Sequence, residues 1–398
     1  MKLKTKHLAY LMMITYMVSY ITRINYGAVL VEMVNATGFT KTQLSIAVTG
    51  SFITYGTGQI ISGYLGDRFS PKRLMASGLA VTAAINMILP FFHDPYSMAA
   101  VWCVNGFAQA FMWPPLVRIM VSVFNEEEYK HAVVTASYGS SLGTVLIYLL
   151  SPLVISLLGW QGVFRTASVC AILMIPVWLY LCPEVSVVRK EKTKTETSGA
   201  ALKVLFTPMI LSCMLAIVLQ GALRDGVTTW MPTYISETYH LGSAVSILTG
   251  VALPLFSLIC FRITEYVHVR FIRSLITCAA AVFAVGTLSA GILLIVTGQS
   301  AAASTACTAV LTGSMHGVNL LLVCMLPQYF KSTGRVSLIS GVLNACTYIG
   351  SAASTYLIPL LITDGNWNTT VLSWLLIAAM GTLLCLICIP AWKKRNFD

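Results

Sequence analysis

The chain alternates between long apolar segments and short polar ones. The apolar segments are roughly 20 residues or longer, enough to cross the hydrocarbon core of a bilayer, and they come in two sets of six. They cover residues 8–34, 43–65, 73–92, 97–121, 132–157, 162–182, 204–236, 241–262, 272–296, 301–327, 335–362 and 368–392. A chain in lipid must satisfy its own backbone hydrogen bonds, so each segment is expected to be an α-helix. The pattern predicts an all-α polytopic protein with twelve transmembrane helices.

One polar stretch is much longer than the other connections. It reads PEVSVVRKEKTKTETSGA and has no core-forming pattern. It predicts an N-terminal six-helix half at 1–182, a linker at 183–200 and a C-terminal six-helix half at 201–398. Two equal, pseudo-symmetric halves are typical of transporters with a central substrate site.

Composition supports a membrane protein. Apolar residues make up 57% of the chain and charged residues 10%, and the net charge is +11. Most of the 25 Lys and Arg residues lie in alternate loops. This is the positive-inside distribution, which predicts both termini in the cytoplasm of an inner-membrane protein. The net positive charge is therefore explained by the orientation of the chain in the membrane, and we expect no nucleic-acid partner.

Two arginines interrupt the apolar segments, Arg23 in the first and Arg224 in the seventh. Arginine is costly inside a bilayer unless it faces a polar space and has a partner. Pseudo-symmetry would place the two opposite each other across a central cavity. Asp225 follows Arg224 directly, and neighbouring side chains point about 100° apart on a helix, so we expect it not to neutralise Arg224. We therefore favour an anion as the partner of both arginines over a structural ion pair.

Polar and aromatic side chains form stripes on several predicted helices. The helical spacing aligns Tyr16, Tyr20 and Arg23; Tyr55, Gln59 and Ser62; Asn105, Gln109 and Trp113; Tyr138 and Ser141; His316 and Asn319; and Ser337, Ser340, Asn344, Tyr348 and Ser351. Each stripe alone could be a hydrogen-bonded seam between helices. Together they favour a binding site. Two guanidinium forks match the oxygens of a dianion, which suggests phosphate or a phosphate ester.

A loop after the second segment carries Gly63, Asp67 and Arg68 in a G-x-x-x-D-R pattern, followed by Ser70-Pro71-Lys72-Arg73. It resembles a cytoplasmic motif of the major facilitator superfamily, and we expect it to gate by contacts between helix ends. The alternative is a generic basic loop.

The sequence contains no residue pattern that indicates a catalytic site or a metal site. The 11 cysteines lie mostly in apolar segments without metal-ligand spacing, and Cys385-x-x-Cys388 has no histidine nearby. No nucleophile–base set or nucleotide loop is evident. We expect no enzyme activity, no cofactor and no metal.

Several blocks together resemble the organophosphate:phosphate antiporter family of that superfamily. They are Tyr20-Ile21-Thr22-Arg23-Ile24-Asn25-Tyr26, Gly38-Phe39-Thr40-Lys41, Tyr55-Gly56, Asn105-Gly106-Phe107, Trp113-Pro114-Pro115, Leu223-Arg224-Asp225-Gly226 and Trp230-x-Pro232-Thr233-Tyr234. The resemblance implies that Arg23 and Arg224 hold the phosphoryl group. It also implies that Tyr16, Tyr20, Tyr55, Trp113 and Tyr348 line the same cavity.

Three positions depart from the glycerol-3-phosphate exchangers. Gln59 stands where a lysine is expected, Tyr138 where a histidine lies, and Thr229 where an aspartate follows the arginine. These departures leave the identity of the ester open. His316 could supply a titratable group or be a packing histidine.

The resemblance implies a monomeric antiporter that exchanges an organophosphate for inorganic phosphate by rocker-switch alternating access. Two alternatives stay open. One is a proton-coupled organic-anion symporter, for which Asp225 is the carboxylate to consider. The other is a transporter-like sensor that binds an organophosphate and signals through a partner.

Overall fold

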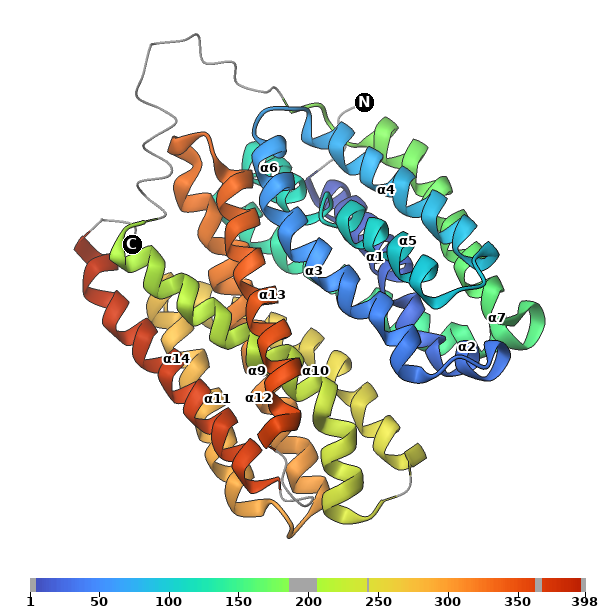
Figure 1. The fold of residues 1–398 in the computed structure, drawn as a ribbon. Coiled ribbons are helices and arrows are strands. Elements are labelled where there is room, and N and C mark those ends of the chain that lie inside the picture. The colour runs from blue at the N-terminus through green and yellow to red at the C-terminus, as the bar shows by residue number, and fades with distance from the viewer. Residues whose placement is uncertain (1–4, 186–205, 242, 362–366, 395–398) are drawn as a thin grey trace. The chain divides into compact units, whose positions relative to one another are not determined.

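The computed structural model describes residues 5–185, 206–241, 243–361 and 367–394 as helices joined by short turns (Figure 1). No β-strand occurs within these ranges. A helix covers each of the twelve predicted apolar segments as far as they are described. Most of the predicted linker, residues 186–200, lies outside the described residues.

Contacts within the chain define two compact units. Unit 1 takes in the described residues up to 185 together with Phe330–Ala345, and unit 2 takes in 206–329 and the described residues from Cys346 onward. The segment 330–345 thus comes from the second half of the sequence but packs with unit 1. The predicted division into two six-helix halves remains a prediction.

Unit 1 contains most of the first half of the chain. Its helices are α1 (Thr5–Ala28), α2 (Leu30–Thr37), α3 (Lys41–Gly66), α4 (Pro71–Ile88), η1 (Leu89–Phe91), α5 (Pro95–Gln109), α6 (Trp113–Val123) and α7 (Glu126–Leu181). The helix α7 covers the fifth and sixth predicted spans. Gly159 separates the two within α7, and its φ of 69° is a left-handed conformation that glycine adopts without strain.

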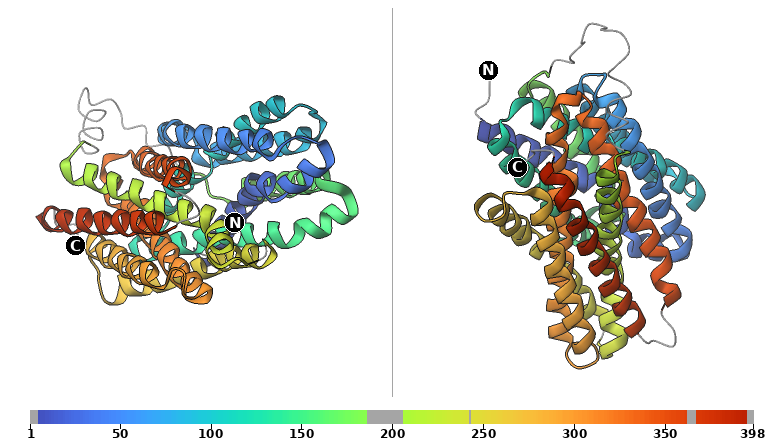
Figure 2. Two further views of the ribbon diagram at one scale, coloured as in Figure 1. Left: turned by 60° about the horizontal axis from the view of Figure 1, so that its bottom comes forward. Right: turned by 90° about the vertical axis from the view of Figure 1, so that its left-hand side faces the viewer.

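The second half of the chain continues with α9 (Pro208–Tyr239), α10 (Ser243–Arg270), α11 (Leu275–Val296), α12 (Ala301–Asn319), the π-helical η2 (Leu320–Met325), the 3-10 helix η3 (Leu326–Thr333), α13 (Val336–Leu361) and α14 (Asn368–Lys394). Within unit 2, α11 packs along α14 and α12, and α14 also packs against α9 (Figures 1 and 2). The first ten residues of α13 belong to unit 1.

Side chains fix where several helices begin. Thr40 and Gln43 form a capping box at the start of α3, and Asn125 and Glu128 form another at the start of α7. Ser70 caps α4, which begins with Pro71. A proline at this position loses no hydrogen bond, since the first helical N–H has no partner within the helix.

Seven helices of the described chain are long and apolar enough to cross a membrane. One of them is α7, whose 56 residues contain the two spans that meet at Gly159. Many large apolar side chains are exposed along these helices, such as Leu173 at 64% and Leu288 at 69%. Surfaces of this kind suit contact with lipid, so the protein is a multi-pass membrane protein.

Candidate functional site

Arg23 lies among aromatic rings in unit 1. Its guanidinium carbon is 3.7 Å from the ring centre of Tyr55 and 5.3 Å from that of Tyr20. The ring of Tyr16 lies 5.1 Å from Tyr20 and 5.0 Å from Trp113. Cation–π attraction holds the guanidinium over a ring without using its N–H donors. Four of the five aromatic residues predicted to line one cavity therefore form a cluster with Arg23, and α1, α3 and α6 each contribute to it.

Three more residues from the predicted site lie in unit 1. The side chains of Gln59 on α3 and Asn344 on α13 are joined by a hydrogen bond of 3.0 Å. Gln59 is fully buried, and its Nε2 has no hydrogen-bond partner. Tyr138 is half-buried on α7, next to Gly139, where α7 meets the backbone of α1 at Met13.

A buried polar network fixes the segment of α1 that carries Arg23. The Thr22 carbonyl accepts hydrogen bonds from Asn86 Nδ2 and Asn105 Nδ2, both 3.1 Å. Asn25 Nδ2 donates to Asn86 Oδ1 at 2.7 Å, and Gln109 Nε2 donates to the Thr22 hydroxyl at 2.9 Å. All of these side chains are at most 2% exposed. The network joins α1, α4 and α5 on both sides of Arg23 in the sequence.

The network corrects one interpretation of the polar stripes. The sequence grouped Asn105 and Gln109 with Trp113 as one face of the fourth span, suited to a binding site. In the structure Asn105 and Gln109 face α1 and α4 and use their amides between helices, whereas Trp113 contacts Tyr16. The chain breaks between α5 and α6 at residues 110–112, so the helical spacing does not continue to Trp113. Asn105 and Gln109 therefore belong to a hydrogen-bonded seam between helices, which was the alternative interpretation of this stripe.

We expect Asn86→Leu to lower the thermal unfolding temperature of the purified protein. The change removes the acceptor of Asn25 Nδ2 and the donor to the Thr22 carbonyl. A buried polar group left without a partner costs about 1–3 kcal/mol. Ser77→Ala on the exposed face of α4 is the matched control. Equal unfolding temperatures for both variants and the unchanged protein would contradict the role of the network.

Arg224 is held by Asp225 in unit 2. Its Nε and Nη2 donate to the two carboxylate oxygens of Asp225, at 2.7 and 2.8 Å. The expectation that Asp225 would not neutralise Arg224 is therefore wrong. The angle between neighbouring residues fixes where the Cβ atoms point, but the long arginine stem lets the guanidinium turn back to its neighbour.

Other residues of unit 2 complete this arrangement. Arg224 Nη1 donates to Asn319 Oδ1 on α12 at 3.3 Å, and Ser351 Oγ on α13 donates to Asp225 Oδ2 at 2.5 Å. The ring centre of Tyr348 lies 6.0 Å from the guanidinium carbon. His316 lies three residues before Asn319 on α12 and packs edge-on against Phe261. Three of the predicted substrate-binding residues therefore lie in unit 2: Arg224, Tyr348 and His316. The sequence did not predict the ion pair of Arg224 with Asp225.

The end of α3 makes a polar contact with the start of α13, both within unit 1. Asp67, the residue after α3, accepts hydrogen bonds from the backbone N–H groups of Ser337 and Leu338 at 3.0 and 2.9 Å. Arg118 on α6 donates to the same carboxylate at 3.3 Å and to the Gly334 carbonyl at 3.1 Å. A carboxylate is favoured at a helix N-terminus, where N–H groups lack partners within the helix. Asp67 therefore connects the N-terminus of α13 to the C-terminal end of α3.

Opposing forces act on the Asp67 carboxyl. Burial raises its pKa to about 6, while the two backbone N–H groups, Arg118 and Arg335 act to lower it. At neutral pH the group is therefore still mostly ionised and can accept all of these hydrogen bonds.

Glycines let the two helices approach closely. A Cβ on Gly63 would lie 2.6 Å from the Ser337 carbonyl oxygen, and one on Gly341 would lie 2.2 Å from the Gln59 carbonyl oxygen. Both distances are too short for any real side chain. Gly63 and Asp67 thus take part in the contact, whereas Arg68 is exposed and its guanidinium lies 3.9 Å from the ring centre of Tyr64.

Sequence reasoning missed Arg118. The sequence did not single out Arg118, but its side chain is only 11% exposed and pairs with Asp67. The position of Arg118 five residues after Trp113 gave no signal of this, because the partner lies 51 residues earlier in the chain.

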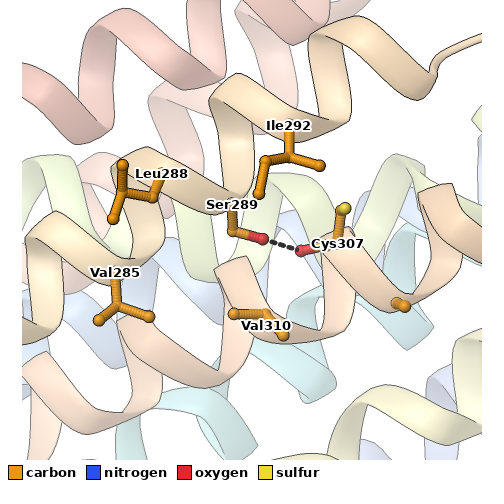
Figure 3. A pocket seen from close by; sticks show the side chains of 7 residues that line it. Val285, Leu288, Ser289, Ile292, Cys307 and Val310 are labelled. Carbon is orange, nitrogen blue, oxygen red and sulfur yellow. Dashed lines mark hydrogen bonds between the residues drawn. The ribbon is translucent and has the colours of Figure 1, made fainter.

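An apolar recess of about 290 Å³ lies between α11 and α12 (Figure 3). Val285, Leu288, Ile292 and Val310 line it, and the Ser289 hydroxyl donates to the Cys307 carbonyl at 2.8 Å. The one hydroxyl in the recess is thus already bonded to backbone. The recess offers no charged group and does not suit a phosphate ester.

Comparison with known protein families gives one extensive match. The model of the Major Facilitator Superfamily matches residues 12–355. The chain also shares its fold with the solved structure of the proton:xylose symporter XylE bound to 6-bromo-6-deoxy-D-glucose. The TM-score is 0.77 and the identity 12%, over 96% of this chain and 94% of that one. The predicted fold class is confirmed.

Individual relatives match shorter parts of the chain. A probable hexose phosphate transport protein of Chlamydia muridarum is 28% identical over 165 residues, which are 42% of this chain and 36% of that protein. The membrane sensor protein UhpC of Salmonella typhimurium is 25% identical over 255 residues, 58% of this chain and 57% of that protein. The chain therefore aligns with about a third to somewhat more than half of these relatives' length. The predicted resemblance to the organophosphate group is confirmed.

Proposed function

This chain belongs to the major facilitator superfamily, and on that premise we propose that it exchanges an organophosphate for inorganic phosphate across the inner membrane. The organophosphate would be a sugar phosphate or a glycerol-phosphate-like ester. Transport would follow rocker-switch alternating access by a monomer with both termini in the cytoplasm. The relative from Chlamydia muridarum, named as a probable hexose phosphate transport protein, supports this substrate class.

The observation that carries the proposal is the setting of the two arginines. Each lies inside an apolar helix segment, and each has aromatic or polar side chains beside its guanidinium. An arginine in a membrane helix is retained for function more often than for stability. We propose that both Arg23 and Arg224 take part in recognition of the phosphoryl group. Tyr16, Tyr20, Tyr55, Gln59, Trp113, Tyr138, His316, Asn344 and Tyr348 would form the remainder of the substrate-binding set.

The pairing of Arg224 changes one part of the mechanism. From the sequence, Arg224 was expected to have an anion rather than Asp225 as its partner. Asp225 neutralises Arg224, so an anion that binds Arg224 meets an ion pair rather than an uncompensated cation.

We propose that the contact of Asp67 with the start of α13 acts as a gate that opens and closes during transport. It is polar and rests on a few hydrogen bonds and close glycine contacts. Ser62, Ser337 and Ser340 near this contact have buried hydroxyls without hydrogen-bond partners. Buried hydroxyls of this kind lower the stability of the closed contact, which would help it to open.

Phosphate efflux from proteoliposomes tests the proposed function. Liposomes with the purified protein are loaded with radiolabelled phosphate, and glucose 6-phosphate, glycerol 3-phosphate or 3-phosphoglycerate is added outside. We expect efflux with at least one ester or with external phosphate, and little efflux without them. Protein-free liposomes are the control. Equal efflux with and without external anion would contradict exchange.

A sensor is the second candidate, because the relative from Salmonella typhimurium is a membrane sensor protein. The same preparation separates the two functions. Binding of an ester without any phosphate efflux would favour the sensor.

A further inference from the structure

The Arg224–Asp225 pair occupies the part of the arginine that an anion would use. The guanidinium presents its best donor pair through Nε and one Nη, and both of these donate to Asp225. The remaining Nη1 contacts Asn319 at 3.3 Å. A phosphate that binds Arg224 through the Nε and Nη2 fork must displace the Asp225 carboxylate, and one that binds through Nη1 and Nη2 lies beside that carboxylate.

Displacing an ionised carboxylate inside a membrane helix is unfavourable. It would leave a negative charge beside the incoming anion in a region of low dielectric constant. Protonation removes that charge. A neutral carboxylic acid no longer competes for the guanidinium, and the positive charge of Arg224 becomes available to the anion.

The surroundings of Asp225 can accommodate the neutral acid. In the ionised state Ser351 Oγ donates to Asp225 Oδ2 at 2.5 Å. Ser351 Oγ also lies 2.9 Å from the Thr347 carbonyl and 3.4 Å from the Gly221 carbonyl. If Asp225 gains a proton, its O–H can donate to Ser351 Oγ, and the serine hydroxyl can turn to the Thr347 carbonyl. Every polar group then keeps a partner.

The Asp225 carboxylate is only partly covered by the protein. The Asp225 side chain is 32% exposed, compared with 12% for Arg224. Of the described residues that act on the charge of Asp225, Arg224 lies on the same helix and His316 lies on α12. The neighbouring helix α13 contributes the Ser351 hydroxyl to Asp225 and the ring of Tyr348 near Arg224.

We propose that Asp225 is a proton-binding site and that a proton binds there when an oxyanion binds Arg224. The proton comes from water and attaches to a carboxylate oxygen of Asp225, and it leaves again when the anion departs. No covalent bond of the substrate changes. This inference rests on the proposed function, and it makes anion transport on this protein proton-linked.

Calorimetric titration with inorganic phosphate tests the proposal on the purified full-length protein in detergent. Titrations at pH 8 in two buffers with different ionisation enthalpies give the number of protons taken up per phosphate bound. We expect uptake of about one proton more in the unchanged protein than in Asp225→Asn. The Asp225→Asn variant mimics the protonated acid, so it should bind phosphate with an affinity that depends less on pH.

Two further variants keep the result interpretable. His316→Gln removes the other titratable neighbour. Because His316 belongs to the proposed binding set, phosphate affinity is expected to fall in this variant, but the number of protons taken up per phosphate bound should stay the same. Ser351→Ala leaves Asp225 in place but removes a hydrogen bond that favours its ionised form, so the pH midpoint of phosphate affinity should move to higher pH. This variant tests the proposal even if Asp225→Asn does not fold.

The outcomes separate this inference from the proposed function. Phosphate binding with the same proton number in the unchanged protein and in Asp225→Asn overturns the inference alone. Loss of uptake in His316→Gln, with no shift in Ser351→Ala, also overturns it and assigns the proton to the histidine. Absence of phosphate binding to the unchanged protein overturns the proposed function, and the inference with it.

Discussion

Replacing Arg23 or Arg224 by lysine is expected to reduce ester-driven phosphate efflux by about 10- to 100-fold. A lysine keeps the positive charge but loses the planar fork that binds two oxygens at once. Hydrogen bonds to charged groups contribute about 1.5–3 kcal/mol, and about 1.4 kcal/mol corresponds to a factor of ten. The Arg23→Lys variant also loses part of the stacking on Tyr55, where the guanidinium carbon lies 3.7 Å from the ring centre.

Efflux from proteoliposomes at several ester concentrations measures this effect. Arg73→Lys is the matched control, because Arg73 is an exposed arginine with a side chain that is 80% accessible. It should retain full efflux. Unchanged efflux in both Arg23→Lys and Arg224→Lys would show that neither arginine recognises the phosphoryl group.

The second large effect is expected from Gly341→Ala on α13. A Cβ at this position would lie 2.2 Å from the Gln59 carbonyl oxygen and 3.3 Å from the Gly63 Cα, both on the backbone of α3. Backbone atoms of a helix cannot move aside as a flexible side chain can. Overpacking of this kind costs about 1–3 kcal/mol, so we expect the contact between α3 and the start of α13 to loosen and efflux to fall by about tenfold.

Gly27→Ala is the control for this substitution, because a Cβ on Gly27 meets nothing within 4 Å. Phosphate binding in detergent is measured beside efflux. Binding that persists while efflux is lost would locate the defect in the gate. Full efflux in Gly341→Ala would contradict a closing role for this contact.

The sequence determined the helices and the nature of the candidate residues. The apolar runs are long enough to cross a bilayer of fixed thickness and predicted twelve helical segments, each of which a helix covers as far as it is described. Arg23, Tyr16, Tyr20, Tyr55 and Trp113 were identified from their helical spacing and the family resemblance, and the structure brings them together in unit 1.

Only the tertiary structure decided which polar groups are partners. Helical spacing relates residues three or four apart, but it gives no information on contacts between distant segments. The Asn86 amide meets Thr22 across 64 positions, and Asp67 meets the N–H groups of α13 across 270 positions or more. Even for neighbours the sequence failed at Arg224 and Asp225, since the flexible arginine stem places the guanidinium independently of the Cβ direction.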